Sequence, residues 1–380
     1  MPSWEFPVAD ISARAKAWAA TMQGNLAEGH LVRAHADSHA RFSPGTRLDR
    51  LAREDREAAL LRPGATRAAG AGNRARAEAP DPDRTCFERD RDRVVHSPAF
   101  RRLAGKTQVV VYPRDHERTR LTHAIEVAQV ATSIARTIGA NVTLTDAIAL
   151  AHDCGHGPGG HASEDAFDPY LPQGYDHGPW GADVTLAGLN LCAETLDGVR
   201  RHSWSNPAPA TIEGEIVSWA DRIAYCAHDL EDAVSAQIVK ITDLPAEVTE
   251  VAGNQRRTQL ATFINAVCQT VFDHGEVGMD RVTGSALAAL RAFNYERIYT
   301  RPQSQEQSAA VIAVLRGLVD YYLEDPQRLP EPLPREATPT DQAVAAVAYV
   351  GGMTDRFAFT TARERLGWDP ARLPRGIGRP

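Results

Sequence analysis

The segment from Ala149 to Glu164 concentrates side chains that could bind a metal ion and move protons. Its sequence, ALAHDCGHGPGGHASE, holds three histidines and two acidic residues among glycines and a proline. Imidazole nitrogens and carboxylate oxygens bind borderline or hard cations, and imidazole titrates near neutral pH. The alternative is an ordinary polar loop. A His-Asp doublet alone is weak evidence, because His228-Asp229 forms a second one in the same chain.

Other ligands could come from distant parts of the chain. His123 lies near the start of one expected helix, and His152-Asp153 ends the next. Asp221 lies in an apolar stretch of a third, where a carboxylate is costly to bury unless it is paired or bound to a metal. Two imidazoles and two carboxylates would bind Mn, Fe, Zn or Mg and leave positions for water and phosphate oxygens. The alternative is a set of solvated side chains and helix ends.

Apolar residues at helical spacing predict the elements that carry these side chains. We expect one helix to end at Gly139 and the next to begin with Thr145 as its N-cap and end at Gly155. Asp221, Tyr225 and Asp229 are spaced i, i+4, i+8 and share one helix face. Strand-like alternation is scarce. The sequence predicts an all-α fold with at most a short β-hairpin. The best candidate for a strand is 107–112. Further helices are expected in 211–239, 284–299, 307–325 and 341–359.

Composition narrows the class of protein. The chain has 380 residues and a formal net charge of −7, which disfavours general nucleic-acid or membrane-surface binding. Its five cysteines are widely spaced and never form C-x-x-C, which favours a reducing compartment. No apolar run approaches the ~18–20 residues of a membrane helix, and MPSWEFPVAD does not read as a secretory signal. We expect a cytoplasmic protein with no membrane partner.

Five collinear motifs then suggest a family. They are RTCFERDRDRVVHSPAFRRLAGKTQV, RTRLTHAIEVAQVATSIA, AIALAHDCGHGPGGHASEDAF, WADRIAYCAHDLEDA and VGGMTDRFAF. Together they resemble the deoxyguanosinetriphosphate triphosphohydrolase family of HD-domain metal phosphohydrolases, over about residues 47 to 365. The resemblance implies a multi-helix HD-domain fold that cleaves a deoxynucleoside triphosphate (dNTP) to the deoxynucleoside and inorganic triphosphate. It implies one divalent metal ion per site (Mg²⁺, Mn²⁺ or another transition metal), held by His123, His152, Asp153 and Asp221.

The same resemblance assigns the remaining roles. Arg120 would contact the phosphates, and Gln108, Tyr225 and Asp229 would bind the sugar and base. Water attack at the α-phosphorus expels a 5′ alkoxide, a poor leaving group that a general acid must protonate. The implied proton-handling group is His156, His161, Glu164 and His177.

Two departures from the family pattern affect the pocket. Gly159, in GHGPGGH, stands where the family usually has an aromatic residue, and GYDHGPWGADV replaces GFEHN-x-Q. The preferred base therefore stays open between dGTP and another dNTP.

The domains are expected as an N-terminal extension over 1–46, an Arg/Gly/Pro-rich and partly disordered connector over 47–84, and the phosphohydrolase domain with a C-terminal helical part over 85–380. The family resemblance also implies a homo-oligomer. Residues 47–106 carry 15 basic against 10 acidic side chains, which motivates single-stranded nucleic acid as a further partner.

Two other functions stay open. One is a different HD phosphohydrolase, such as a 5′-nucleotidase or a cyclic-nucleotide or alarmone hydrolase. The other is a non-catalytic nucleotide- or nucleic-acid-binding regulatory module. The phosphorus product distinguishes the first from a triphosphohydrolase, and metal-dependent turnover distinguishes the second.

Overall fold

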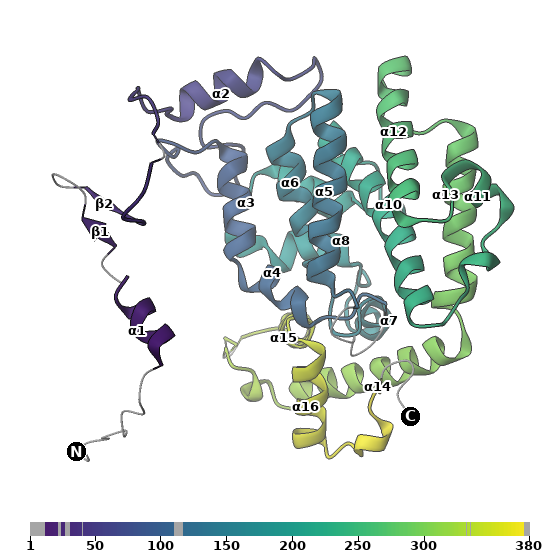
Figure 1. Cartoon of the computed structure of the whole chain (residues 1–380). Coiled ribbons are helices and arrows are strands. Elements are labelled where there is room, and N and C mark those ends of the chain that lie inside the picture. The colour runs from purple at the N-terminus through teal and green to yellow at the C-terminus, as the bar shows by residue number, and fades with distance from the viewer. Residues whose placement is uncertain are drawn as a thin grey trace, which may run out of the picture. The chain divides into compact units, whose positions relative to one another are not determined.

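The computed structural model describes residues 12–21, 24–26, 31–39, 41–109, 117–331, 333–334 and 336–375. Its contacts divide the chain into two units, Met1–Arg47 and Leu48–Pro380 (Figure 1). The first unit contains a short helix, α1 (Ala13–Ala19), and two paired antiparallel strands, β1 (Asn25–Leu26) and β2 (Val32–Arg33). No residue before Leu48 is buried among those whose exposure is described.

The second unit is helical, and the predicted all-α fold is confirmed. In the described part of the chain, β1 and β2 are the only strands that pair as a sheet. Residues 110–112 of the strand candidate lie outside the described residues, and Thr107 forms an isolated bridge with Thr119. The α-helices of this unit are α2 (Arg50–Ala58), α3 (Cys86–His96), α4 (Pro98–Arg102), α5 (Arg120–Ile138), α6 (Val142–Ala151), α7 (Ala162–Phe167), α8 (His177–Trp180), α9 (Ala193–Arg201), α10 (Ile212–Ser235), α11 (Ala246–Ala252), α12 (Arg256–His274), α13 (Arg281–Asn294), α14 (Pro302–Glu324), α15 (Pro339–Gly351) and α16 (Asp355–Leu366).

Helices α5, α6 and α10 form the centre of the larger hydrophobic core, and each packs against the other two (Figure 1). Buried alanines recur along α5 and α6, and such small side chains let helices approach closely. Apolar side chains such as Val127, Ile148 and Ile216 fill the space between the helices. This packing brings together the first turn of α5, the C-terminal end of α6 and the middle of α10.

Helix boundaries follow local capping. Helix α5 ends at Gly139, whose φ of 78° is left-handed, as the glycine predicted. The predicted N-cap at Thr145 is wrong, because Asn141 caps α6 one turn earlier by accepting hydrogen bonds from the backbone N–H groups of Thr143 and Leu144. Thr145 lies inside the helix, and its hydroxyl donates to the Asn141 carbonyl.

A second hydrophobic cluster joins α7, α14, α15 and α16. The single helix predicted over 341–359 is two helices. The break falls at Gly352–Thr354, because the Thr354 side chain caps α16 by accepting from the backbone N–H of Phe357. Asp355, at the start of α16, connects this cluster to the segments that contain Thr107 and Gly159. Its carboxylate accepts hydrogen bonds from the backbone N–H groups of both residues.

Residues 48–84, most of the expected connector, belong to the second unit and contain α2. Arg74 anchors this stretch. Its guanidinium pairs with Asp90 of α3 at 2.6 Å, and both side chains are buried. None of the helices described is long and apolar enough to cross a membrane.

Candidate metal and catalytic site

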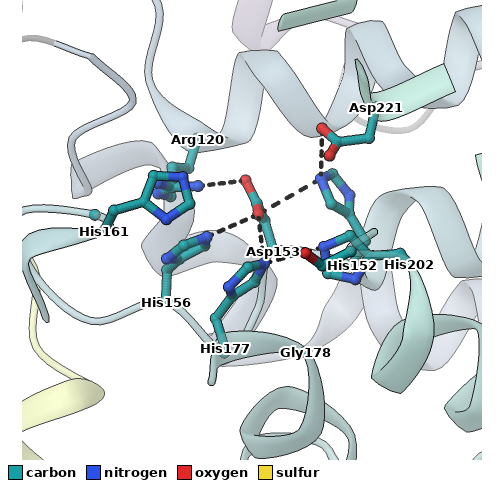
Figure 2. Close-up of polar contacts among 12 residues, drawn as sticks. Arg120, His152, Asp153, His156, His161, His177, Gly178, His202 and Asp221 are labelled. Carbon is teal, nitrogen blue, oxygen red and sulfur yellow. Dashed lines mark hydrogen bonds and ion pairs between the residues drawn. The ribbon is translucent and has the colours of Figure 1, made fainter. Parts of the chain in front are cut away.

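A cavity of ≈ 430 Å³ lies at the junction of α5, α10 and the loops after α6 and α9. Most predicted site residues line it, and Figure 2 shows several of them gathered around Asp153. His152 and Glu164 do not line the cavity themselves. They contact Asp153 and His161, respectively, which do. The predicted residues in the lining are Gln108, Arg120, His123, Asp153, His156, His161, His177, Asp221, Tyr225 and Asp229.

Each of the two predicted histidine ligands lies within 4.0 Å of both predicted carboxylate ligands. His123 Nε2 is 3.0 Å from Asp221 Oδ1 and 3.9 Å from Asp153 Oδ2. His152 Nε2 is 3.5 Å from Asp153 Oδ1 and 3.6 Å from Asp221 Oδ1. A cation with bonds of about 2.1 Å separates adjacent ligand atoms by roughly 3.0–3.5 Å. The donor set and its spacing therefore fit one divalent cation.

The state of His152 supports that fit. Its Nδ1 lies 2.6 Å from the Ala149 carbonyl, which only accepts, so Nδ1 carries a proton and Nε2 is the nitrogen that can bind either a second proton or a cation. The buried Nε2 has no hydrogen-bond partner. Burial opposes protonation, but the carboxylates of Asp153 and Asp221 outweigh it and raise the pKa of His152 to about 9. The two carboxylates thus favour a positive charge at the position of Nε2, which a bound cation can supply in place of a proton.

Arg120 combines a structural contact with free donors. Its Nη1 donates to Asp153 Oδ2 at 2.7 Å, while the buried Nε and Nη2 have no partner. Burial opposes ionisation of Asp153, yet the Arg120 charge helps hold the pKa of this carboxyl well below its usual range. A Cβ on Gly160 would lie 2.8 Å from Nη2, so glycine leaves the room that the guanidinium occupies. The unpaired donors suit a phosphate oxygen.

The predicted proton-handling residues form one cluster. Glu164 lies 3.3 Å from Nδ1 of His161 and accepts from Nδ1 of His177 at 2.5 Å. Despite burial, these two imidazoles hold the pKa of Glu164 far below its usual range. His156 stacks on His177 with ring centres 3.7 Å apart, and burial lowers its pKa well below the usual value. His161 is the accessible member, with 73% of its side chain exposed.

The predicted sugar and base residues line the same cavity. Tyr225 accepts a hydrogen bond from Arg291 at 2.9 Å. Asp229 accepts one from the Tyr299 hydroxyl at 2.5 Å, and its Oδ1 has no partner. Burial raises the pKa of Asp229 to about 7. Gln108 lines the same cavity, with its buried Oε1 unpaired.

Several residues that line the cavity were not predicted from the sequence. Arg222 stacks 3.3 Å above the Trp204 ring, and its position next to Asp221 was an available signal. Arg291 and Tyr299 reach the cavity from beyond α12, and no local pattern marks them. His202, the C-cap of α9, is buried between His152 and His177, and burial lowers its pKa to about 3. Its local sequence, RRHSW, matches no ligand motif.

Gly159 occupies a restricted position. Its φ is +74°, and a Cβ there would lie 2.4 Å from Val311 Cγ1 on α14. A larger side chain at position 159 would collide with this valine. The position of α14 therefore requires a glycine here. Gly159 therefore leaves room for Val311, and both residues line the cavity.

Comparison with known proteins agrees with this geometry. Residues 120–226 match the HD domain, and residues 277–364 match the phosphohydrolase-associated domain. The first match begins at Arg120 and includes the four candidate metal ligands. The fold and site therefore define an HD-domain phosphohydrolase.

Relatives identify the family more closely. A deoxyguanosinetriphosphate triphosphohydrolase-like protein of Caldanaerobacter subterraneus subsp. tengcongensis is 37% identical over 318 residues, covering 82% of this chain and 94% of the relative. Proteins of the same name match from Desulfatibacillum aliphaticivorans (37% over 337 residues, 81% and 95% covered) and Clostridium perfringens strain 13 (38% over 300 residues, 75% and 87% covered). The chain belongs to the deoxyguanosinetriphosphate triphosphohydrolase-like family, which confirms the resemblance.

A solved structure of a hypothetical protein from Aquifex aeolicus also matches, with a TM-score of 0.47 and 17% identity. The match covers 73% of this chain and 68% of that one.

Proposed function

We propose that this protein hydrolyses a deoxynucleoside triphosphate to the deoxynucleoside and inorganic triphosphate. The observation that carries the proposal is the convergence in one cavity of a two-His, two-Asp donor set, a buried arginine with unpaired donors and an exposed histidine paired with Glu164. His123, His152, Asp153 and Asp221 would hold one divalent cation, such as Mg²⁺ or Mn²⁺. When bound, that cation would supply Lewis-acid polarisation of a phosphoryl oxygen and lower the pKa of bound water.

The chain's own residues would position the triphosphate and move one proton. Arg120 would donate from Nε and Nη2 to phosphate oxygens, because both atoms are buried and unpaired. Water attacks the α-phosphorus, and the bond to the 5′ oxygen breaks with its electron pair on that oxygen. His161 would donate the proton that neutralises the leaving oxygen, and Glu164 would orient its imidazole.

The nucleoside would contact Tyr225, Asp229 and Gln108, which all line the cavity. The Tyr225 ring could stack on the sugar or base, while the unpaired oxygens of Asp229 and Gln108 could accept hydrogen bonds. Arg291 holds the Tyr225 hydroxyl in place. This set would contact the sugar and base of the nucleoside, and the base that it prefers is measured by the panel below.

A substrate and metal panel tests the proposal. Each of the four dNTPs is incubated with Mg²⁺, Mn²⁺ or Co²⁺, and inorganic triphosphate is measured. We expect metal-dependent triphosphate release that Asp153→Ala reduces by more than about 100-fold, because loss of residues that only orient ligands costs roughly 10–100-fold. Asp146→Ala is the matched control, since this α6 carboxylate pairs with Arg91 outside the cavity.

Two outcomes would contradict the proposal. Release of orthophosphate or pyrophosphate in place of triphosphate would favour another HD phosphohydrolase. No turnover of any dNTP with any of the three metals would favour a non-catalytic binding module.

A further inference from the structure

His161, the proposed proton donor, follows a glycine loop, which we define as residues 157–160. The sequence of this loop is Gly-Pro-Gly-Gly, and both Gly159 and Gly160 have left-handed backbones, with φ of 74° and 66°. Glycine has more conformational freedom than any other residue, so a loop of this composition needs contacts that fix it. The His161 side chain is exposed and contributes little packing. The position of the proton donor therefore depends on what holds the loop.

Two buried side chains from distant parts of the chain hold the glycine loop. Asp355, the first residue of α16, accepts a hydrogen bond at Oδ1 from the backbone N–H of Gly159 at 2.9 Å. Lys106 donates from Nζ to the carbonyl of His156, the residue directly before the loop. The same ammonium donates to the carbonyl of Gly351, the last residue of α15, at 2.9 Å. The loop is thus attached to the junction between α15 and α16.

The second oxygen of Asp355 holds the segment that packs against the loop. Its Oδ2 accepts from the backbone N–H of Thr107 at 3.1 Å and also from the hydroxyl of that residue. Thr107 lines the cavity and forms a β-bridge with Thr119, the residue before α5. A Cβ on Gly160 would lie 3.0 Å from the Thr107 carbonyl oxygen, so the loop and this segment are in close contact. One carboxylate therefore fixes the glycine loop and the adjacent cavity wall together.

A helix-capping role does not account for these contacts of Asp355. An acidic residue in the first turn can stabilise a helix through its free N–H groups or its dipole. In α16 the N-cap is Thr354, whose hydroxyl accepts from the backbone N–H of Phe357. Both oxygens of Asp355 instead accept from backbone N–H groups outside α16. The carboxylate is therefore directed at the cavity wall and away from its own helix.

We propose that Asp355 is a positioning residue that holds the glycine loop so that His161 reaches the leaving oxygen. This inference rests on the proposed function, in which His161 donates the proton. Neither Asp355 nor Lys106 lines the cavity, so both act through the backbone that they hold. Asp355 lies in the match to the phosphohydrolase-associated domain, whereas the loop lies in the match to the HD domain. The associated region thus orients a proton donor that the HD region supplies.

Hydrogen–deuterium exchange of Asp355→Ala, read by mass spectrometry without substrate, tests whether this carboxylate holds the loop. The substitution removes both acceptors. Exchange in the peptide 155–163 should rise by about tenfold or more, because a hydrogen bond to a charged group contributes at least that much to an opening equilibrium. Exchange in α5 and α10 should stay the same, since a local contact is lost and the main core is kept.

The kinetics of the same variant test whether the position of the loop matters for the reaction. With the dNTP that the unmodified protein hydrolyses fastest, we expect kcat to fall by roughly 10–100-fold, because a displacement of about 1 Å can cost that much. KM should change far less, since the proposed substrate contacts Arg120, Tyr225 and Asp229 belong to α5 and α10. Asp341→Ala is the matched control. This exposed acid in the first turn of α15 pairs only locally, with Thr338, so exchange in the loop and kcat should both be unchanged.

Lys106→Met provides an independent test, which also serves if Asp355→Ala does not fold. It removes the donor to the His156 carbonyl and keeps a side chain of similar length, so exchange in the same peptide should rise and kcat should fall.

Three results would overturn the inference. Unchanged exchange in the loop of the folded variants would show that Asp355 and Lys106 do not hold it. An equal rise in exchange across the loop, α5 and α10 would show a general loss of stability. Faster exchange in the loop with an unchanged kcat would show that its position does not govern the reaction. If the unmodified protein hydrolyses no dNTP, the proposed function fails, while exchange still decides whether Asp355 holds the loop.

Discussion

At the scale of single residues, Arg120 lies between one of the candidate metal ligands and the cavity. One of its nitrogens binds Asp153, and two others are buried without partners at the cavity wall. Leaving charged donors buried and unpaired is costly, so the arrangement makes physical sense when an anion completes it. The same residue thus stabilises the ionised Asp153 and, under the proposed function, would donate to the triphosphate.

Asp229 makes a pH-dependent contribution to stability. Its pKa in the folded protein is about 7, because the carboxyl is buried, against about 3.9 in an unfolded chain. A raised pKa means that the folded state binds more protons between these values. The stabilising contribution is complete below about pH 4 and is lost as the pH rises through about 7.

Asp229→Asn removes this dependence, since an amide does not ionise. Relative to the unmodified protein, we expect the variant to gain stability between pH 5 and pH 8, by an amount on the order of 2–3 kcal/mol. Urea unfolding of both metal-free proteins at the two pH values measures the change. An equal stability difference at pH 5 and pH 8 would show that Asp229 is ionised in the folded protein throughout.

At the scale of elements, the stretch before α3 is held by one buried ion pair. Arg74 donates to Asp90 of α3 and to the carbonyls of Cys86 and Asn190. The other Asp90 oxygen accepts from the backbone N–H of Cys192 and the hydroxyl of Thr195, at the start of α9. This network connects residues 71–74 with two helices, one of which ends at His202.

Removing Arg74 should therefore be costly. Arg74→Ala leaves the Asp90 carboxylate buried without its counter-charge, and we expect a loss of roughly 3–5 kcal/mol in the free energy of unfolding. Arg76→Ala is the matched control. This side chain is exposed and donates to the Gly188 carbonyl, so the loss should stay below about 1 kcal/mol. Denaturant unfolding compares the two, and similar midpoints would contradict the importance of the Arg74 network.

Sequence patterns predicted the long central helices well and their ends less well. The apolar spacing on α5 and α10 survives in the fold because one face of each helix packs into the core. Thr145 was a poor N-cap prediction because two cap-forming residues compete and Asn141 comes first. The break between α15 and α16 was missed because GGMTD lies within a continuous apolar pattern.

At the scale of the whole molecule, the site could be predicted only where motifs are local. The His-Asp doublet, Arg120 and the Asp221 face follow from short patterns and from the family resemblance. His202, Arg291 and Tyr299 are brought in by the packing of later helices, which no spacing rule describes. The residues missed are thus those whose partners lie far along the chain.

The folded chain also changes how much positive charge the arginine-rich region 47–106 exposes. Several of its arginines are paired with acidic side chains, which reduces the positive charge available to a nucleic acid. Examples are Arg53 with Glu88, Arg74 with Asp90, and both Arg89 and Arg93 with Glu78. Net positive charge along the sequence therefore overstates the positive surface of the fold.

The central claim is that water attacks the α-phosphorus of a dNTP at the HD centre. Turnover in ¹⁸O-labelled water, followed by mass spectrometry of the products, tests it directly. We predict one ¹⁸O atom in the inorganic triphosphate and none in the deoxynucleoside. Label in orthophosphate, in pyrophosphate or in the hydroxyl of the deoxynucleoside would contradict the account.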